Sequence, residues 1–171
     1  HLITAHVSPG THSREEWNRP WLDLAAVHTT GDDVYTRIRL AREVTPAKPV
    51  FLLQGDYANE SGRSVEEIRA QMYQALLGGA CGHVYGNNPT WGFATDATDP
   101  VAALAATAGL DWASQLGALG AEYLDEAADL IAARLLADTA PDTAHEYVTS
   151  GYGSAEDLTR VPVAAQRQFL V

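Results

Sequence analysis

A well-delimited helix separates two short apolar runs in the middle of this chain. The first run is Val50–Leu53 and the second is Ala80–Tyr85. Between them, residues 64–67 read Ser-Val-Glu-Glu, the pattern of a capping box, and the apolar positions that follow fall on one helical face until Gly78 and Gly79. Because a continuous apolar run suits a strand buried on both faces, this arrangement predicts two parallel strands joined by a helix.

The same alternation extends along the chain in both directions. Leu2–Val7 and Leu22–Thr29 are predicted strands, Val34–Val44 is a predicted helix, and residues 112–137 form an Ala- and Leu-rich helix. Four strands in this order fit half of an eight-stranded barrel or part of a doubly wound sheet. The chain has no Gly-x-Gly-x-x-Gly or Gly-Lys-Ser/Thr phosphate loop, and polar residues follow the strands, as the active face of a barrel requires. We therefore expect an α/β fold that forms half of a (β/α)8 TIM barrel.

A different module is expected near the C-terminus. Residues 138–141 have the composition of a linker, and the β-like runs His145–Ser150 and Val161–Gln166 come after it. We expect residues 1–140 to form the half-barrel. Residues 141–171 are then the linker and the first strands of a β-sandwich domain.

The composition excludes several classes of protein. A net charge of −11 over 171 residues argues against binding to nucleic acid or to an anionic membrane, which requires clustered Lys and Arg. No apolar run reaches the roughly 18 residues that a membrane helix needs. The single cysteine, Cys81, excludes a disulfide within the chain. The chain is long enough for one ordinary domain with its own core.

Polar groups suited to sugar binding follow the two apolar runs of the central unit. The second run contains His83 and leads into two asparagines, a proline and Trp91. An indole offers a flat apolar face to a sugar ring, while imidazole and amide groups make directional hydrogen bonds to hydroxyls. The first run leads into the carboxylates of Asp56 and Glu60. These strand ends therefore have the composition of a sugar subsite beside carboxylates.

Each of these residues also has an ordinary structural interpretation. An aspartate at the start of a loop, such as Asp56, commonly accepts hydrogen bonds from nearby backbone amides. His83 fits a buried, hydrogen-bonded histidine, and Trp91 fits a residue packed beneath the rim of a barrel. His6 and His28 end predicted strands on the same rim.

Six histidines and many carboxylates also raise the alternative of a metal site. A metal-dependent hydrolase of this type would need a His-x-His pair or a His-Glu-x-x-His helix, and the sequence contains neither. His1 and His6 are five positions apart, so that they would face opposite sides of a strand. We therefore expect no metal and no cofactor.

Four segments carry more specific motifs. They are His-Leu-Ile-Thr-Ala-His at residues 1–6, Pro-Trp-Leu-Asp at 20–23, a stretch from Lys-Pro-Val to Asn-Glu at 48–60, and Gly-Ala-Cys-Gly-His-Val-Tyr-Gly-Asn at 79–87. They resemble the His-Pro-Ile-Thr-Tyr-His, Pro-Trp-Leu-Asp-Phe, Lys-Pro-Val…Gly-Glu-Pro-x-Tyr-Glu and Gly-Ala-x-Gly-His-x-Tyr-Gly-x segments of the apiosidase-like glycoside hydrolases, glycoside hydrolase family 140 and its relatives. The last of these matches is the most specific.

The resemblance implies a fold and an activity. Residues 1–137 would supply strands 5 to 8, the C-terminal half of the barrel, and a β-sandwich would follow. The implied enzyme is a retaining glycosidase, secreted or periplasmic, that hydrolyses a terminal sugar, apiose or another pentose, from a plant-type polysaccharide. Its nucleophile would follow strand 7, at Asp56 or Glu60, and its acid/base would follow strand 4, outside this chain. The implied substrate-binding residues are His6, Tyr57, His83, Tyr85, Asn87 and Trp91.

The catalytic segment departs from the family pattern. The family's Gly-Glu is Gly55 and Asp56 in this chain, and its Tyr-Glu is Asn59 and Glu60. A retaining enzyme holds its two carboxyl groups about 5–5.5 Å apart, and the shorter Asp56 would draw its carboxylate back from the anomeric carbon. Three alternatives stay open: Asp56 attacks after local repacking, Glu60 takes the role, or catalysis is lost. The last alternative is a non-catalytic carbohydrate-binding or scaffold protein on a degenerate barrel.

The expected partners follow from the incomplete barrel. The first residues, His-Leu-Ile-Thr-Ala-His, look like a strand entered in mid-fold, so we expect the chain to be a fragment. A half-barrel has two unpaired sheet edges. We therefore expect it to bind a carbohydrate substrate and to pair with the remainder of its own polypeptide, the N-terminal half-barrel, or with another copy.

Overall fold

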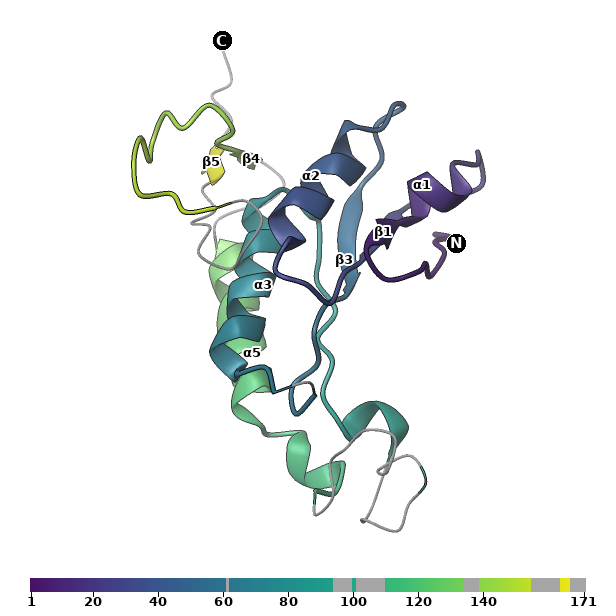
Figure 1. Cartoon of the computed structure of the whole chain (residues 1–171), viewed down its shortest axis with the longest axis vertical. Coiled ribbons are helices and arrows are strands. Elements are labelled where there is room, and N and C mark those ends of the chain that lie inside the picture. Colours follow the sequence, from purple (N-terminus) through teal and green to yellow (C-terminus); the bar gives the residue numbers. More distant parts are fainter. Residues whose placement is uncertain (61, 94–99, 101–109, 134–138, 155–163, 167–171) are drawn as a thin grey trace. The chain divides into compact units, whose positions relative to one another are not determined.

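The computed structural model describes residues 1–60, 62–93, 100, 110–133, 139–154 and 164–166 (Figure 1). The chain divides into two compact units. Unit 1 comprises His1–Gly55, Ala70–Val84 and Arg134–Val171, and unit 2 comprises Asp56–Arg69 and Tyr85–Ala133. No helix in the described part of the chain is long and apolar enough to cross a membrane.

Unit 1 contains a small mixed sheet with the strand order β1-β2-β3. Strands β2 (Ala25–His28) and β3 (Val50–Gln54) are parallel, and β1 (Thr11–His12) is antiparallel to β2. Every residue of β2 is buried, as expected of a strand covered on both faces. The short helix α1 (Ser13–Trp17) follows β1 directly. The predicted parallel pairing of the strands in Leu22–Thr29 and Val50–Leu53 is therefore confirmed.

Helix α2 (Val34–Glu43) joins β2 to β3 and lies beside β3 in Figure 1. Its buried residues Val34, Ile38 and Ala41 recur at helical spacing, so that one face of the helix is apolar. That face joins an apolar core with side chains from β2, β3 and the region of Ala75 and Ala80. Burial of each large aliphatic side chain contributes about 1.5–3 kcal/mol, which makes this core the main support of unit 1.

Helix α3 (Val65–Leu77) begins and ends as the sequence predicts. The Glu67 backbone N–H donates to Ser64 Oγ at 3.2 Å, and the Ser64 N–H donates to the Glu67 carboxylate at 2.8 Å, which completes the capping box. At the other end, Gly79 has a φ of 100° and its N–H donates to the Leu76 carbonyl at 3.1 Å. The Ala80 N–H donates five residues back, so the helix ends in a Schellman motif that needs this glycine.

The predicted strand over Leu2–Val7 is wrong, because the segment forms no regular ladder. The Ile3 carbonyl accepts from the backbone N–H groups of both Asp23 and Leu24, and the Ile3 N–H donates to the Asp23 carboxylate at 2.9 Å. Strand β1 pairs with β2 at Val27 and His28, the positions that a longer N-terminal strand would need. The segment therefore runs beside β2 as an irregular coil.

The Ala80–Tyr85 segment lies beside β3 as predicted but is less regular than a strand. The Cys81 N–H donates to the Val50 carbonyl at 2.7 Å, and the Leu52 backbone bonds Gly82 and Val84 on either side of His83. Leu52 and His83 form an isolated parallel bridge. The pairing is correct, but it involves too few consecutive residues to make a named strand.

The C-terminal predictions are mixed. Helix α5 (Leu119–Ala133) is confirmed within the predicted helical region, and the 3-10 turn η2 (Ala113–Gln115) comes before it. The segment predicted as a linker contains β4 (Thr139–Pro141), which forms an antiparallel pair with β5 (Ala164–Gln166). Residues 145–150 form no strand, because the buried Asp142 carboxylate accepts two backbone N–H groups and closes a local turn. Residues 134–138 and 161–163 lie outside the described residues, and the β-sandwich stays a prediction.

Candidate active site

The eight predicted site residues fall into both units. His6 and His83 belong to unit 1. The others belong to unit 2, and they are Asp56, Tyr57, Glu60, Tyr85, Asn87 and Trp91. The segments that carry them follow strand β3 or the Ala80–Val84 segment beside it, where each strand has just ended. Loops at the carboxyl ends of parallel strands are the usual place for catalytic groups in α/β enzymes.

Asp56 is the more firmly held of the two candidate carboxylates. It is buried, and Arg63 Nε lies 2.9 Å from its Oδ2. Arg63 also contacts the Glu67 carboxylate at 3.3 Å, so that its guanidinium is fixed from the first turn of α3. Glu60 is exposed, and its described contacts run through its backbone, which bonds Tyr57 and Arg63 in a turn. Of these two candidates, Asp56 is therefore the one whose carboxylate is fixed by contacts among the described residues.

The backbone after Asp56 is paired with the segment after His83 within unit 2. The Ala58 N–H donates to the Gly86 carbonyl at 3.0 Å, and the Asn88 N–H donates to the Ala58 carbonyl at 2.9 Å. Tyr57 packs so closely on Gly86 that a Cβ there would lie 2.1 Å from its ring. Burial raises the pKa of Tyr57, and the charge of Glu60 raises it further. The Tyr57 hydroxyl therefore stays protonated at neutral pH and can donate a hydrogen bond.

Tyr85 and Asn87 form one pair of polar side chains in unit 2. Asn87 is buried and donates from Nδ2 to the Tyr85 hydroxyl at 3.2 Å. Burial raises the pKa of Tyr85, while the hydrogen bond from Asn87 acts in the opposite direction. Asn59, which has a left-handed φ of 62°, donates from its amide to Asn87 Oδ1 at 3.3 Å. Asn87 is thus part of a buried network that orders the loop.

Trp91 is anchored at its indole nitrogen and is half exposed. Its indole N–H donates to the Oδ1 of Asn88, whose side chain is fully buried. The whole residue nevertheless remains 51 % exposed. An indole that is tethered at its nitrogen and half exposed is available for stacking on a sugar ring. Asn88 was not predicted as a site residue, because the segment that resembles the family ends at Asn87.

His83 is a half-buried, neutral imidazole. Burial lowers its pKa to about 4, so the ring carries no charge at neutral pH. Among the described residues, no partner lies within hydrogen-bond distance of its buried Nδ1. His83 is therefore half-buried, and its Nδ1 has no hydrogen-bond partner within the part of the chain that the structure describes.

His6 lies in a cluster with two residues that were not predicted as site residues, His28 and Gln54. His6 Nε2 and Gln54 Oε1 are 2.7 Å apart. The rings of His6 and His28 meet edge to face, with centroids 5.1 Å apart. Their position in the sequence could have identified them, because His28 and Gln54 are the last residues of β2 and β3. We refer to these three residues as the His6 cluster.

Within the described part of the chain, no group of three or more His, Cys, Asp or Glu side chains is arranged to hold a metal ion. The chemistry available from the described residues is that of carboxylates, neutral imidazoles, phenols and amides. These groups support acid, base and nucleophilic roles and hydrogen bonding to neutral ligands.

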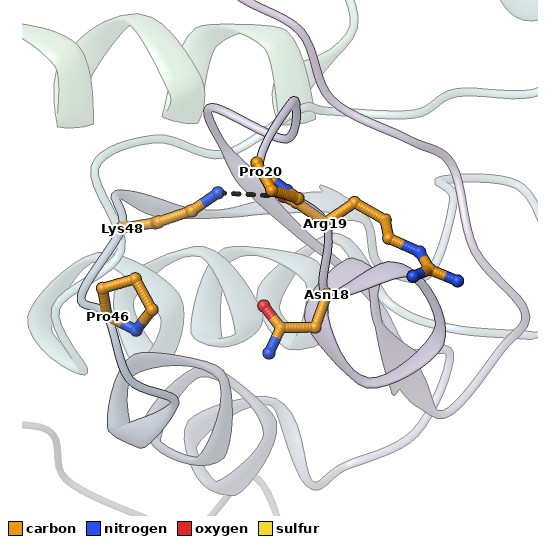
Figure 2. A pocket seen from close by; sticks show the side chains of 5 residues that line it. All are labelled: Asn18, Arg19, Pro20, Pro46 and Lys48. Carbon is orange, nitrogen blue, oxygen red and sulfur yellow. Dashed lines mark hydrogen bonds between the residues drawn. The ribbon is translucent and has the colours of Figure 1, made fainter.

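A separate surface pocket of about 390 Å³ lies in unit 1 (Figure 2). It is lined by Asn18, Arg19, Pro20, Pro46 and Lys48. These residues precede β2 and β3, so that the pocket lies near the amino ends of the two parallel strands. The Lys48 ammonium donates to the Arg19 carbonyl at 3.3 Å and also to the Leu22 carbonyl, so it is engaged in holding the chain. In barrel folds this end supports stability rather than catalysis, and the predicted site residues lie elsewhere.

The sequence profile described as the apiosidase-like catalytic domain matches residues 1–138. The chain belongs to this family. Among curated proteins, no match was found for the apiosidase-like chain. The resemblance inferred from the four sequence segments is therefore confirmed.

Solved structures of glycoside hydrolases share the fold of this apiosidase-like chain. One is described as a glycoside hydrolase family 5 protein from Bacteroides vulgatus ATCC 8482, with 20 % identity and a TM-score of 0.84. Another, described as a glycoside hydrolase, has 20 % identity and a TM-score of 0.82. The similarity covers 97 % of this chain in both cases, but only 40 % and 42 % of those chains. The apiosidase-like chain thus spans about two fifths of the length of the structures that it matches.

Proposed function

We propose that this apiosidase-like chain is part of a retaining glycoside hydrolase that removes a terminal sugar, apiose or another pentose, from a plant-type polysaccharide. The observation that carries the proposal is the buried Asp56 carboxylate, which comes directly after β3 and Gly55 and is fixed by Arg63 at 2.9 Å. A nucleophile must be held in a defined orientation, and Glu60 is exposed by comparison. The family and the shared fold support the reaction class.

The proposed reaction has two steps. The Asp56 carboxylate attacks the anomeric carbon, and the bond from that carbon to the leaving-group oxygen breaks as a second carboxylic acid protonates the oxygen. Water then attacks the resulting glycosyl ester and gives its proton to the second carboxylate, which restores Asp56 and retains the anomeric configuration. The second carboxyl group belongs to the remainder of the polypeptide.

The proposed roles of the other predicted residues follow from their contacts. Trp91 stacks on a sugar ring through its open face, and the protonated Tyr57 hydroxyl donates to an oxygen of the substrate. The half-buried, neutral imidazole of His83 exchanges a hydrogen bond with a sugar hydroxyl. Tyr85 and Asn87 act together, because they are already hydrogen-bonded to each other.

We further propose that the chain forms strands 5 to 8 of a (β/α)8 barrel that the remainder of its polypeptide, or another copy, completes. The coverage of about two fifths of the matched structures supports this. So do the exposed apolar side chains of Leu2, Ile3, Trp17 and Trp21 in the segments before β2. The 171 residues produced alone should associate or unfold without cooperativity. A monodisperse monomer with a cooperative unfolding transition would contradict the half-barrel.

A non-catalytic sugar-binding protein is the second candidate, and the same ion pair favours it. An aspartate that replaces the family's glutamate and is engaged by Arg63 has a shorter reach and fewer free lone pairs for attack. In that case the half-exposed indole of Trp91 and the neutral imidazole of His83 would bind sugar without bond cleavage.

The decisive experiment compares Asp56→Ala with Glu60→Ala in the full-length polypeptide, using aryl pentosides as substrates. Asp56→Ala should lower kcat by on the order of 10³-fold or more, while Glu60→Ala should retain most turnover. Azide added to Asp56→Ala should fill the space of the lost carboxylate and give a glycosyl azide of inverted configuration. Turnover that survives both substitutions would overturn the mechanism. Sugar binding by the wild type without any turnover would establish the non-catalytic alternative.

A further inference from the structure

We propose that His6 and Gln54 form a hydroxyl-binding pair for a vicinal diol of a neutral sugar, and that His28 is the residue that positions this pair. The inference deepens the proposed function, on which it rests for the class of ligand. His6 is exposed and Gln54 is half-buried at the end of β3, so the pair is accessible from solvent. Neither Gln54 nor His28 was assigned a role from the sequence.

The first argument is the pattern of donors and acceptors that the pair presents. His6 Nε2 and Gln54 Oε1 are 2.7 Å apart, and within the described chain this is the hydrogen bond that each side chain makes. A neutral imidazole has one N–H and one lone pair, and a primary amide has two donors and one carbonyl oxygen. If Nε2 donates to the amide oxygen, His6 Nδ1 offers a lone pair and the Gln54 amide offers an N–H.

The complementary arrangement leads to the same result. If the Gln54 amide nitrogen donates to Nε2 instead, then His6 Nδ1 offers an N–H and the Gln54 oxygen offers lone pairs. In both arrangements the pair keeps one donor and one acceptor for a ligand, one on each side chain. Adjacent sugar hydroxyls each donate and accept, so they match such a pair. A carboxylate or a phosphate needs two donors, and a metal cation needs two lone pairs.

The second argument is that His28 fixes the position of His6. His28 is only 5 % exposed, and its Nδ1 lies 2.8 Å from the Val7 carbonyl. A carbonyl can only accept, so Nδ1 carries the proton and the orientation of the ring is defined. Because Val7 adjoins His6 in the chain, this hydrogen bond also fixes the backbone beside His6. The His6 ring then rests against the edge or face of a ring that is itself fixed.

The third argument is a local irregularity in the sheet. Strands β2 and β3 pair in regular register from Ala25 to Val27, but the register shifts between Val27 and His28. As a result His28 lies opposite Gln54, one residue further along β3 than a regular ladder would place it. Irregularities of this kind re-aim side chains and occur next to active sites. Here the shift aligns the last residues of two strands with each other.

The test measures sugar binding without turnover, in full-length protein that carries Asp56→Ala. The probes are a methyl pentoside, its monodeoxy analogues and a pentose-derived carboxylate, with affinities from calorimetry or ligand-observed NMR. Gln54→Leu should weaken methyl pentoside binding about ten-fold, the value of one lost hydrogen bond of about 1.4 kcal/mol. It should also abolish discrimination against the deoxy analogue that lacks the recognised hydroxyl. Thr30→Ala, an exposed change after β2, is the matched control.

Two variants of His28 test its positioning role. Asn can place an amide N–H where His28 Nδ1 donates, so His28→Asn should preserve discrimination between the pentoside and its deoxy analogue, whereas His28→Leu should lose it. A merely structural role would lower Tm in His28→Leu and leave discrimination unchanged. Nitrogen-15 NMR should independently show His28 as the Nδ1–H tautomer.

The outcomes separate this proposal from the proposed function. Three results would each overturn the hydroxyl-binding pair. They are unchanged discrimination between the pentoside and its deoxy analogue in Gln54→Leu, preference for the carboxylate probe, and no binding of the methyl pentoside by the parent protein. If Gln54→Leu loses discrimination while the Asp56 wild type binds sugar without turnover, the pair is supported and the hydrolase function fails.

Discussion

The two units of this molecule hold their polar residues in different ways. Unit 1 fixes the ends of β2 and β3 through an apolar core that includes Val27, Ile38 and Leu52. The described contacts that order the loops of unit 2 are largely polar, such as the Asp56–Arg63 ion pair and the Asn59 amide bonds. The packed core fixes the position of a residue at a strand end, whereas a loop residue must be fixed by specific hydrogen-bond or ion-pair partners. Substitutions in the apolar core and substitutions of the polar partners should therefore have different effects on stability and activity.

The largest expected effect concerns the core of unit 1. Ile38→Ala should lower the free energy of unfolding by about 3–4 kcal/mol, because it removes a fully buried side chain and leaves a cavity. Leu40→Ala is the matched control on the same helix, since Leu40 is 46 % exposed and should change stability by less than about 0.5 kcal/mol. Chemical denaturation of the full-length protein measures both. Equal effects would show that apolar packing does not support unit 1.

The next effect concerns the ion pair of unit 2. Arg63→Met should destabilise the protein by about 2–3 kcal/mol, because it leaves the Asp56 carboxylate buried without its cation. Adding Asp56→Asn to Arg63→Met should restore much of that stability, since no unpaired charge remains, but it should not restore turnover. Denaturation and kinetics on the single and double variants separate the two roles. Full recovery of activity in the double variant would exclude Asp56 as the nucleophile.

His83 predicts a pH dependence of stability. Its pKa is about 4 in the folded protein and 6.5 in the unfolded chain, so between these values the unfolded chain binds more protons. Stability therefore falls as the pH falls from 7 toward 4, and the contribution of His83 between pH 7 and pH 5 is about 2 kcal/mol. His83→Gln should lose less stability than the wild type over this range. His1→Gln, an exposed control, should follow the wild type. A wild-type-like dependence of stability on pH in His83→Gln would contradict the neutral imidazole.

The smallest effect concerns the start of α3, whose first residues belong to unit 2. Ser64→Ala removes the side-chain acceptor of the Glu67 N–H and should cost about 1 kcal/mol. Glu66→Ala, a change at a neighbouring exposed position, is the control and should have a smaller effect. Thermal unfolding of both variants is sufficient to compare them. A loss of activity in Ser64→Ala larger than its loss of stability would show that the capping box also positions Arg63.

The sequence predicted the features of the fold that depend on neighbouring residues. The capping box at Ser64, the glycine that ends α3 and the apolar face of α2 each involve groups within a few positions of one another. The parallel pairing of Val50–Gln54 with Ala25–His28 followed from two apolar runs joined by a helix. The four family segments depend only on the order of residues, so the family could also be inferred without coordinates.

The tertiary structure decided which side chains meet. His6 and Gln54 are 48 positions apart and are brought together because an irregular N-terminal segment runs beside β2, where a strand had been predicted. Arg63 reaches Asp56 only because the intervening turn reverses the chain, and β4 forms only where β5 supplies its partner. Helix caps and apolar faces arise from short-range interactions that residue order specifies. The pairing of distant polar groups depends on the path of the whole chain, which no local pattern encodes.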